Sequence, residues 1–254
     1  MGITTNPINK VSAVASVIAI EFLNTFWVRV DSAIGVSLSW GPVSLYDTQI
    51  KPFRKGGRER VSDVDWEEAN LEGVVWHQKT FDQANFRHVR WEGAEIRGCR
   101  FLHCDFTGAS FNHAILKDSL FAACEWRWAR FIGAQLIDLK MVGNSLEQAD
   151  LAGIVIRGGD WSSTRMRYQV LSGQDFSGMQ WREADFYGAD FRQVQFHSAD
   201  LTRVVLDKAN LTDADLRGAE IEGINWVPVA LHQVILDQAQ AIQVVRSLGA
   251  TVRD

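Results

Sequence analysis

An apolar residue recurs at every fifth position of this 254-residue chain, without a break from Trp66 to Trp226. The thirty-three positions of this register hold only Leu, Ile, Met, Phe and Trp. With 46% hydrophobic residues overall, chance would produce such a run on the order of once in 10¹¹ trials. A period of five fits neither an α-helix nor an extended strand, so the backbone must bend once per unit.

The other positions of the unit are also patterned around each of these central residues. Fourteen alanines lie two places before a central residue, and Cys99, Cys104 and Cys124 occupy the same place. We therefore interpret the thiols as small buried side chains in alanine positions, because five-residue spacing matches no common zinc site. The place before the centre is polar and often Asp or Asn, and the two places after it are rich in Gly and polar residues.

Units of this kind predict a narrow all-β solenoid. If each unit forms one side of a coil, the central and small residues point inward, and successive coils pair their backbones at about 4.8 Å. Such an interior is filled by side chains and has no room for a substrate. We therefore expect no catalytic, metal or cofactor site, and we interpret the histidines as solvated residues near the bends. They are His77, His88, His103, His113 and His197.

The first sixty residues lack the repeat. The apolar stretch 11–20 ends at Glu21 and is too short to span a bilayer, and no convincing signal-peptidase site follows it. With three irregularly spaced cysteines, a cytoplasmic location without membrane contact is the simplest expectation. We interpret residues 1–60 as a non-repeat segment. Our hypothesis is that it is an N-terminal extension from a misplaced start, because 55–60 resembles a translated purine-rich ribosome-binding site and Val61 fits a GTG start codon.

Several units resemble the repeat of pentapeptide-repeat proteins, for example Ala184-Asp185-Phe186-Tyr187-Gly188 and Ala214-Asp215-Leu216-Arg217-Gly218. The resemblance implies a right-handed quadrilateral β-helix over 61–228, with four units per coil and thus about eight coils. The mid-array segment 171–178 and the tail are similar to those of the MfpA and Qnr quinolone-resistance type. Qnr-type proteins have projecting loops, whereas this register has no insertion, so the loop-free MfpA arrangement is the closer match.

The C-terminal segment 229–254 is predicted to cap the array. The repeat is expected to stop at Pro228, and a short α-helix is expected to follow, with Asp237 as its N-cap and Gly249 as its C-cap. The resemblance implies that this tail forms a homodimer. The helix face predicted to make that contact consists of Ala241, Val244, Val245 and Leu248.

The resemblance also implies a DNA mimic that binds DNA gyrase or a related type II topoisomerase and protects it from quinolones or a natural topoisomerase toxin. Residues after 60 carry nineteen basic and twenty-seven acidic side chains, which argues against direct nucleic-acid binding and suits a basic protein surface. With residues twenty apart on one side, the predicted partner-binding carboxylates fall in four outward rows. They are Asp105, Glu125 and Asp185; Asp150 and Asp190; Asp175 and Asp215; and Asp160, Asp200 and Glu220.

Two alternatives stay open. Each carboxylate before a central residue could serve the repeat itself, through hydrogen bonds to nearby main chain, rather than a partner. The whole array could also be a scaffold or interaction module with another partner, because a fold does not specify a function.

Overall fold

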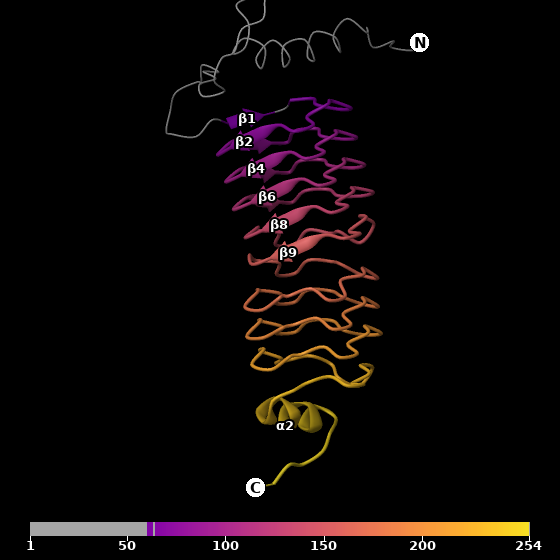
Figure 1. Ribbon diagram of the computed structural model, residues 1–254. Coiled ribbons are helices and arrows are strands. Elements are labelled where there is room, and N and C mark those ends of the chain that lie inside the picture. The colour runs from indigo at the N-terminus through magenta and orange to yellow at the C-terminus, as the bar shows by residue number, and fades with distance from the viewer. Residues whose placement is uncertain (1–59, 63, 254) are drawn as a thin grey trace, which may run out of the picture. The chain divides into compact units, whose positions relative to one another are not determined.

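The computed structural model describes residues 60–62 and 64–253, which form a stack of coils followed by one helix (Figure 1). The predictions for the segment before residue 60 lie outside the described residues. No helix in the described part is long and apolar enough to cross a membrane. The strands have three residues each: β1 (Arg60–Ser62), β2 (Val75–His77), β3 (Thr80–Asp82), β4 (Glu95–Arg97), β5 (Arg100–Leu102), β6 (Ile115–Lys117), β7 (Leu120–Ala122), β8 (Gln135–Ile137) and β9 (Val155–Arg157).

The strands form two parallel sheets, in the orders β1-β3-β5-β7 and β2-β4-β6-β8-β9. Every pairing joins residues twenty apart, as Phe81 with Phe101 and Trp76 with Ile96. Isolated bridges, on the other two sides and beyond the ends of these two sheets, keep the same offset, from Asp65 with Asn85 to Asp215 with Ile235. The predicted β-solenoid with twenty residues per coil and a short C-terminal helix is therefore confirmed.

A turn or a bend follows each central residue of the repeat. The carbonyl of Trp66, for example, accepts a hydrogen bond from the backbone N–H of Ala69 at 2.8 Å, and Glu68 between them has φ +61°. This positive φ at the second turn residue is what a type II turn requires, and it favours glycine. The turn explains why glycine is frequent at the second place after the centre. It also explains the period of five, because one turn and one short extended segment complete a unit.

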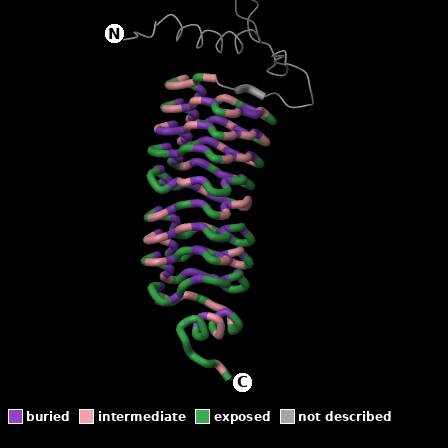
Figure 2. The backbone as a smooth tube through the Cα atoms, turned by 180° about the vertical axis from the view of Figure 1, so that it is seen from behind, coloured by how far each residue is buried: buried purple, intermediate pink, exposed green. Residues whose placement is uncertain are grey.

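The interior is filled along its length, and buried residues alternate with exposed ones around each coil (Figure 2). Aromatic rings from successive coils stack in columns, with centroids 5.1 Å apart for Phe81 and Phe101 and 4.8 Å for Phe101 and Phe121. The three cysteines are buried and free, as expected for side chains in alanine positions.

Three amides in small-residue positions were not expected from the pattern. Asn144 and Gln169 are buried and Gln174 is half-buried, and each lies where the backbone pairing of adjacent coils is interrupted. The Asn144 Nδ2 donates to the carbonyls of Phe121 and Met141, both at 2.9 Å. Its Oδ1 accepts from the Cys124 N–H at 3.3 Å and from the Trp126 Nε1 at 3.0 Å. These side chains therefore substitute for missing coil-to-coil hydrogen bonds.

The prediction that the repeat stops at Pro228 is wrong. Ala230 bridges Asn210, and Leu231 and Leu236, which extend the five-residue register, pack partly buried against the core. Proline has no N–H and cannot adopt positive φ, so it excludes the left-handed turn conformation and the bond to a further coil, but the chain still completes this coil past it.

Helix α2 (Gln238–Ser247) closes the end of the stack. Asp237 is its N-cap, as predicted, and forms a capping box with Gln240. The C-cap is Leu248 rather than Gly249, which follows it with φ +89°. The Gln240 side chain donates to the carbonyls of Leu216 and Ala219, at 2.6 and 2.8 Å. The helix thereby satisfies backbone groups that no further coil would cover.

Candidate partner-binding surface

The outward side chains form columns that follow the coil pairing. Bridges connect Asp105 to Glu125, and they connect Asp160 through Gln180 to Asp200 and Glu220. The other predicted rows also lie where the sequence placed them, but most of their carboxylates are separated by a neutral or cationic residue. Arg165, for example, is bridged to Asp185, and Arg130 to Asp150.

Most of these carboxylates serve the turn that follows them. The Asp105 Oδ1 accepts the N–H of Thr107 at 2.8 Å, and the Asp200 Oδ1 accepts that of Thr202 at 2.9 Å. The same bond is made by the other aspartates of the predicted set, which are Asp150, Asp160, Asp175, Asp185, Asp190 and Asp215. An Asp or Asn side chain that bonds the backbone two residues on is a common turn device. The architectural alternative is therefore confirmed for these residues, and a row position alone does not identify a partner contact.

Arginines from the adjacent coil neutralise three of the predicted carboxylates. The pairs are Arg87 with Asp105 at 3.3 Å, Arg167 with Asp185 at 2.7 Å, and Arg182 with Asp200 at 2.7 Å. In each pair the arginine follows a central residue and the aspartate lies eighteen positions later. The fold places these two positions on neighbouring coils, so the spacing was a readable signal that the sequence analysis missed.

Three more carboxylates pair within their own unit. Arg192 contacts Asp190 and Arg217 contacts Asp215, both at 2.6 Å, and Arg127 lies 4.0 Å from Glu125. Of the ten predicted residues, those without an ion pair in the described structure are Asp150, Asp160, Asp175 and Glu220. The charge available to a partner is therefore smaller than the acidic residue count suggests.

Asp215 is the most tightly held of these carboxylates. It is only 9% exposed, and besides Arg217 it contacts the His197 Nε2 at 2.9 Å. The hydrogen bonds from Arg217, and then the one from His197, hold the pKa of Asp215 well below its ordinary range. These contacts identify Asp215 as a structural residue near the C-terminal end of the stack.

The four residues predicted to form the dimer face of α2 differ in exposure. Val244 is buried, and it packs with the core of its own solenoid. Ala241 is exposed, and the side chains of Val245 and Leu248 are 43% and 51% exposed. The helix therefore uses one side to cap its own chain and leaves three of the four predicted residues accessible.

An exposed aromatic corner was not foreseen from the sequence. Trp128 and Tyr168 follow central residues by two places, two coils apart, and are 61% and 65% exposed. Both have positive φ, which is costly for bulky side chains. Tyr168 packs edge-on against Tyr187, and Arg167 and Lys208 lie over the Tyr187 ring at 5.5 and 5.1 Å. A bulky aromatic residue in a turn position whose positive φ favours glycine was the missed signal.

Among solved structures, the chain is similar to QnrB1, a plasmid-mediated fluoroquinolone resistance protein, at 23% identity and a TM-score of 0.46, over 72% of this chain and 97% of that one. A full-length QnrB1 structure matches at 22% identity and a TM-score of 0.36, over 76% and 100% of the two chains. HetL, involved in heterocyst differentiation regulation in the cyanobacterium Nostoc, matches at 20% identity and a TM-score of 0.35, over 69% and 84%. No curated protein sequence matches.

Family models give a direct assignment. The model described as "Pentapeptide repeat region" matches residues 94–166, and that described as "Pentapeptide repeats (8 copies)" matches 170–203 and 189–225. Together they span just over half of the 254 residues. Together with the twenty-residue coils, these matches establish that the chain belongs to the pentapeptide-repeat proteins.

Proposed function

We propose that this protein is a DNA mimic that binds DNA gyrase or a related type II topoisomerase and protects it from quinolones or a natural topoisomerase toxin. The observation that carries the proposal is the set of carboxylates held at fixed coil spacing on the outside of a filled solenoid. Asp160, Asp200 and Glu220 share one column, and Asp150 and Asp175 lie on two other sides without an ion pair.

The charge density of the solenoid limits the mimicry. Residues 61–254 carry an excess of eight acidic groups. Eight coils at about 4.8 Å each give roughly one net charge per 5 Å, against about one per 1.7 Å for duplex DNA. The proposed contact therefore has about a third of the linear charge of DNA. We expect its affinity to fall with salt less steeply than that of DNA for the same surface.

A supercoiling assay with the full chain and purified gyrase, with and without ciprofloxacin, tests the proposal. Inhibition of supercoiling, or rescue from the drug, is expected at micromolar protein, and the absence of both effects would refute it. A variant that combines Asp160→Asn, Asp175→Asn and Glu220→Gln should weaken the effect at least several-fold. Asparagine preserves the turn-acceptor oxygen, so the fold should remain intact.

The matched control removes the same charge far from α2. It combines Glu67→Gln, Glu68→Gln and Glu72→Gln at the first coils. If both triple variants lose activity equally, net charge rather than the named columns is responsible.

We propose further that the accessible side of α2 makes a homodimer. Val245→Asp should give a monomer by light scattering with an unchanged melting temperature of the solenoid. Val244→Asp should instead destabilise the capped end, because Val244 is buried within its own chain. A Val245→Asp variant that keeps the dimer mass contradicts this assignment.

The second candidate function is an interaction module for a different protein, and the aromatic corner favours it. Exposed Trp and Tyr beside Arg is the composition of interface hot spots. A double variant, Trp128→Ser and Tyr168→Ser, separates the two candidates: gyrase inhibition should survive it if the acidic columns make the contact.

A further inference from the structure

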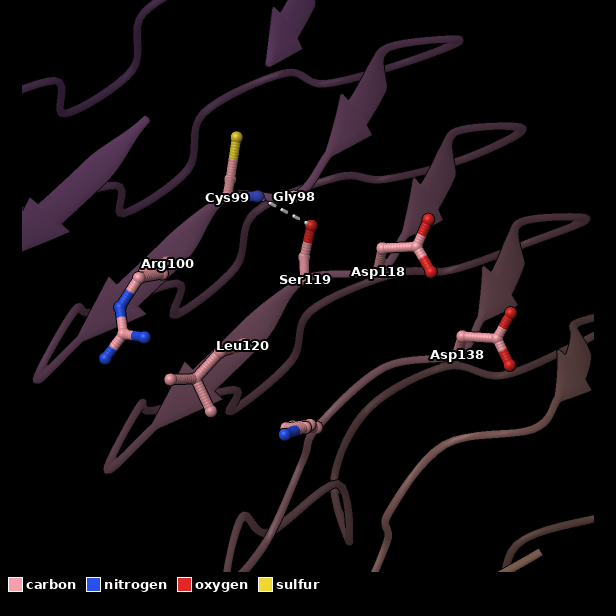
Figure 3. Close-up of a pocket in the computed structure, with 8 residues that line it drawn as sticks. Gly98, Cys99, Arg100, Asp118, Ser119, Leu120 and Asp138 are labelled. Atoms are coloured by element: carbon pink, nitrogen blue, oxygen red, sulfur yellow. Dashed lines mark hydrogen bonds between the residues drawn. The ribbon is translucent and has the colours of Figure 1, made fainter. Parts of the chain in front are cut away.

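A shallow hollow of about 210 Å³ lies on the outer surface of the coils that carry β5 and β7 (Figure 3). Its lining includes charges of both signs. Figure 3 shows Arg100 on one side and Asp118 and Asp138 on the other, and the coil pairing places Lys140 in the column of Arg100. Small residues lie between them, and the Ser119 hydroxyl accepts the Cys99 N–H at 3.1 Å. The lining includes none of the carboxylates of the proposed function, although Asp160 follows Lys140 in the same column.

The coil geometry fixes how these charges are spaced. Arg100, Leu120 and Lys140 follow one another in a single column of paired residues. At about 4.8 Å per coil, the two cations are therefore about 10 Å apart, with Leu120 between them. Asp118 and Asp138 form a second column, one coil apart. Two residues of extended chain separate the columns, which is about 6 to 7 Å.

The four charged side chains do not neutralise one another. Among the described residues, none of them has an ion-pair partner. Asp190 and Arg192, which are also two residues apart, do form an ion pair at 2.6 Å. The absence of an ion pair between Asp138 and Lys140 therefore needs a physical reason.

The backbone of the turn supplies that reason. Asp118 and Asp138 both have φ +51°, at the second turn position. The Asp138 carboxylate lies over Gly158, where a Cβ would be only 2.2 Å from its Oδ1. The carboxylate thus extends along the stack toward Gly158 of the next coil. Two like charges held one coil apart repel each other, and a cation between them relieves the repulsion.

We propose that this hollow binds a small zwitterion of amino-acid size. Its ammonium group lies between Asp118 and Asp138, its carboxylate lies between Arg100 and Lys140, and its aliphatic part covers Leu120. A volume of about 210 Å³ corresponds to about seven water molecules at roughly 30 Å³ each. An ω-amino acid with four methylene groups has about this size, and its charges are separated by about the distance between the two columns.

Titration of the full-length protein with 5-aminopentanoate, followed by NMR chemical shifts, tests the site. Saturable shifts are expected at the coils of 98–140. Pentanoate and pentylamine, which each lack one charge, should bind at least tenfold more weakly. Glycine, whose charges are too close together to reach both columns, should also bind at least tenfold more weakly.

Variants decide whether the named side chains are responsible. Asp138→Asn and Lys140→Gln should each weaken 5-aminopentanoate binding at least tenfold. The matched controls are Asp213→Asn, also an exposed aspartate at a second turn position with positive φ, and Arg165→Gln, which like Lys140 precedes a central residue. Both should leave binding unchanged. The proposal is overturned by absence of saturable binding, by equal binding of either singly charged analogue, or by equal loss in the control variants.

Discussion

For the replacement of Asn144 by alanine, the sequence pattern and the structure predict opposite effects on stability. Alanine is the commonest residue in this place of the repeat, so the pattern alone predicts a neutral or stabilising change. In the structure Asn144 is only 2% exposed. Its side chain makes four hydrogen bonds of 3.3 Å or less, at a place where the pairing of adjacent coils is interrupted. We therefore expect Asn144→Ala to destabilise the protein.

The magnitude follows from the groups that lose their partners. The Cys124 N–H and the Trp126 Nε1 are buried donors that Asn144 satisfies. Each buried polar group without a partner costs about 1 to 3 kcal/mol, so the two donors together cost about 2 to 6 kcal/mol. A water molecule in the vacated space would restore part of these bonds, which places the expected loss near the lower half of this range.

Urea unfolding followed by circular dichroism measures this loss, with Cys124→Ala as the matched control. Cys124 occupies the same small-residue position one coil earlier, so its replacement should cost less than about 1.5 kcal/mol. Hydrogen exchange should also show faster exchange at the coils of 121–146 in Asn144→Ala than in the control. An Asn144→Ala protein as stable as the parent would refute the role assigned to the buried amide.

Three further predictions follow from the surface contacts. Because the pKa of Asp215 is depressed in the folded state, its contribution to stability is present above the ordinary carboxyl pKa of about 4 and is lost as pH falls below it; Asp215→Asn should flatten the acid limb of a stability-versus-pH curve. Arg182→Gln should cost less than about 1 kcal/mol in thermal unfolding, because its pair with Asp200 is largely exposed on the arginine side. Gln240→Ala should lower the melting temperature by leaving the Leu216 and Ala219 carbonyls without their donor, whereas the exposed Gln238→Ala should not.

The core could be predicted from sequence because it depends on one local rule repeated many times. A central residue such as Phe106 is inward wherever the unit bends, and no long-range information is needed to place it. The same rule placed Cys99 and Cys124 correctly. It failed at Pro228, because proline was read as the end of the array, although Leu231 and Leu236 continue the register.

The candidate surface was less predictable because its contacts join different coils. The pairing of Arg167 with Asp185 requires knowing that eighteen residues span almost one coil. The burial of Val244 but not Val245 depends on how α2 docks on the last coil. Neither follows from the five-residue period, which specifies what is inside a coil but not which exposed groups meet.

Departures from the repeat rule carry more functional information than agreement with it. An aspartate such as Asp150 is favoured by its own turn, so its presence says little about a partner. Trp128 and Asp138 are instead disfavoured by their own turns, because positive φ at their position favours glycine and neither side chain bonds to the turn. A residue kept against the preference of its own backbone needs a reason outside that backbone. Nineteen non-glycine residues with positive φ occur along the described array, and those at the aromatic corner and at the charged hollow are where we expect ligand contacts beyond the acidic columns.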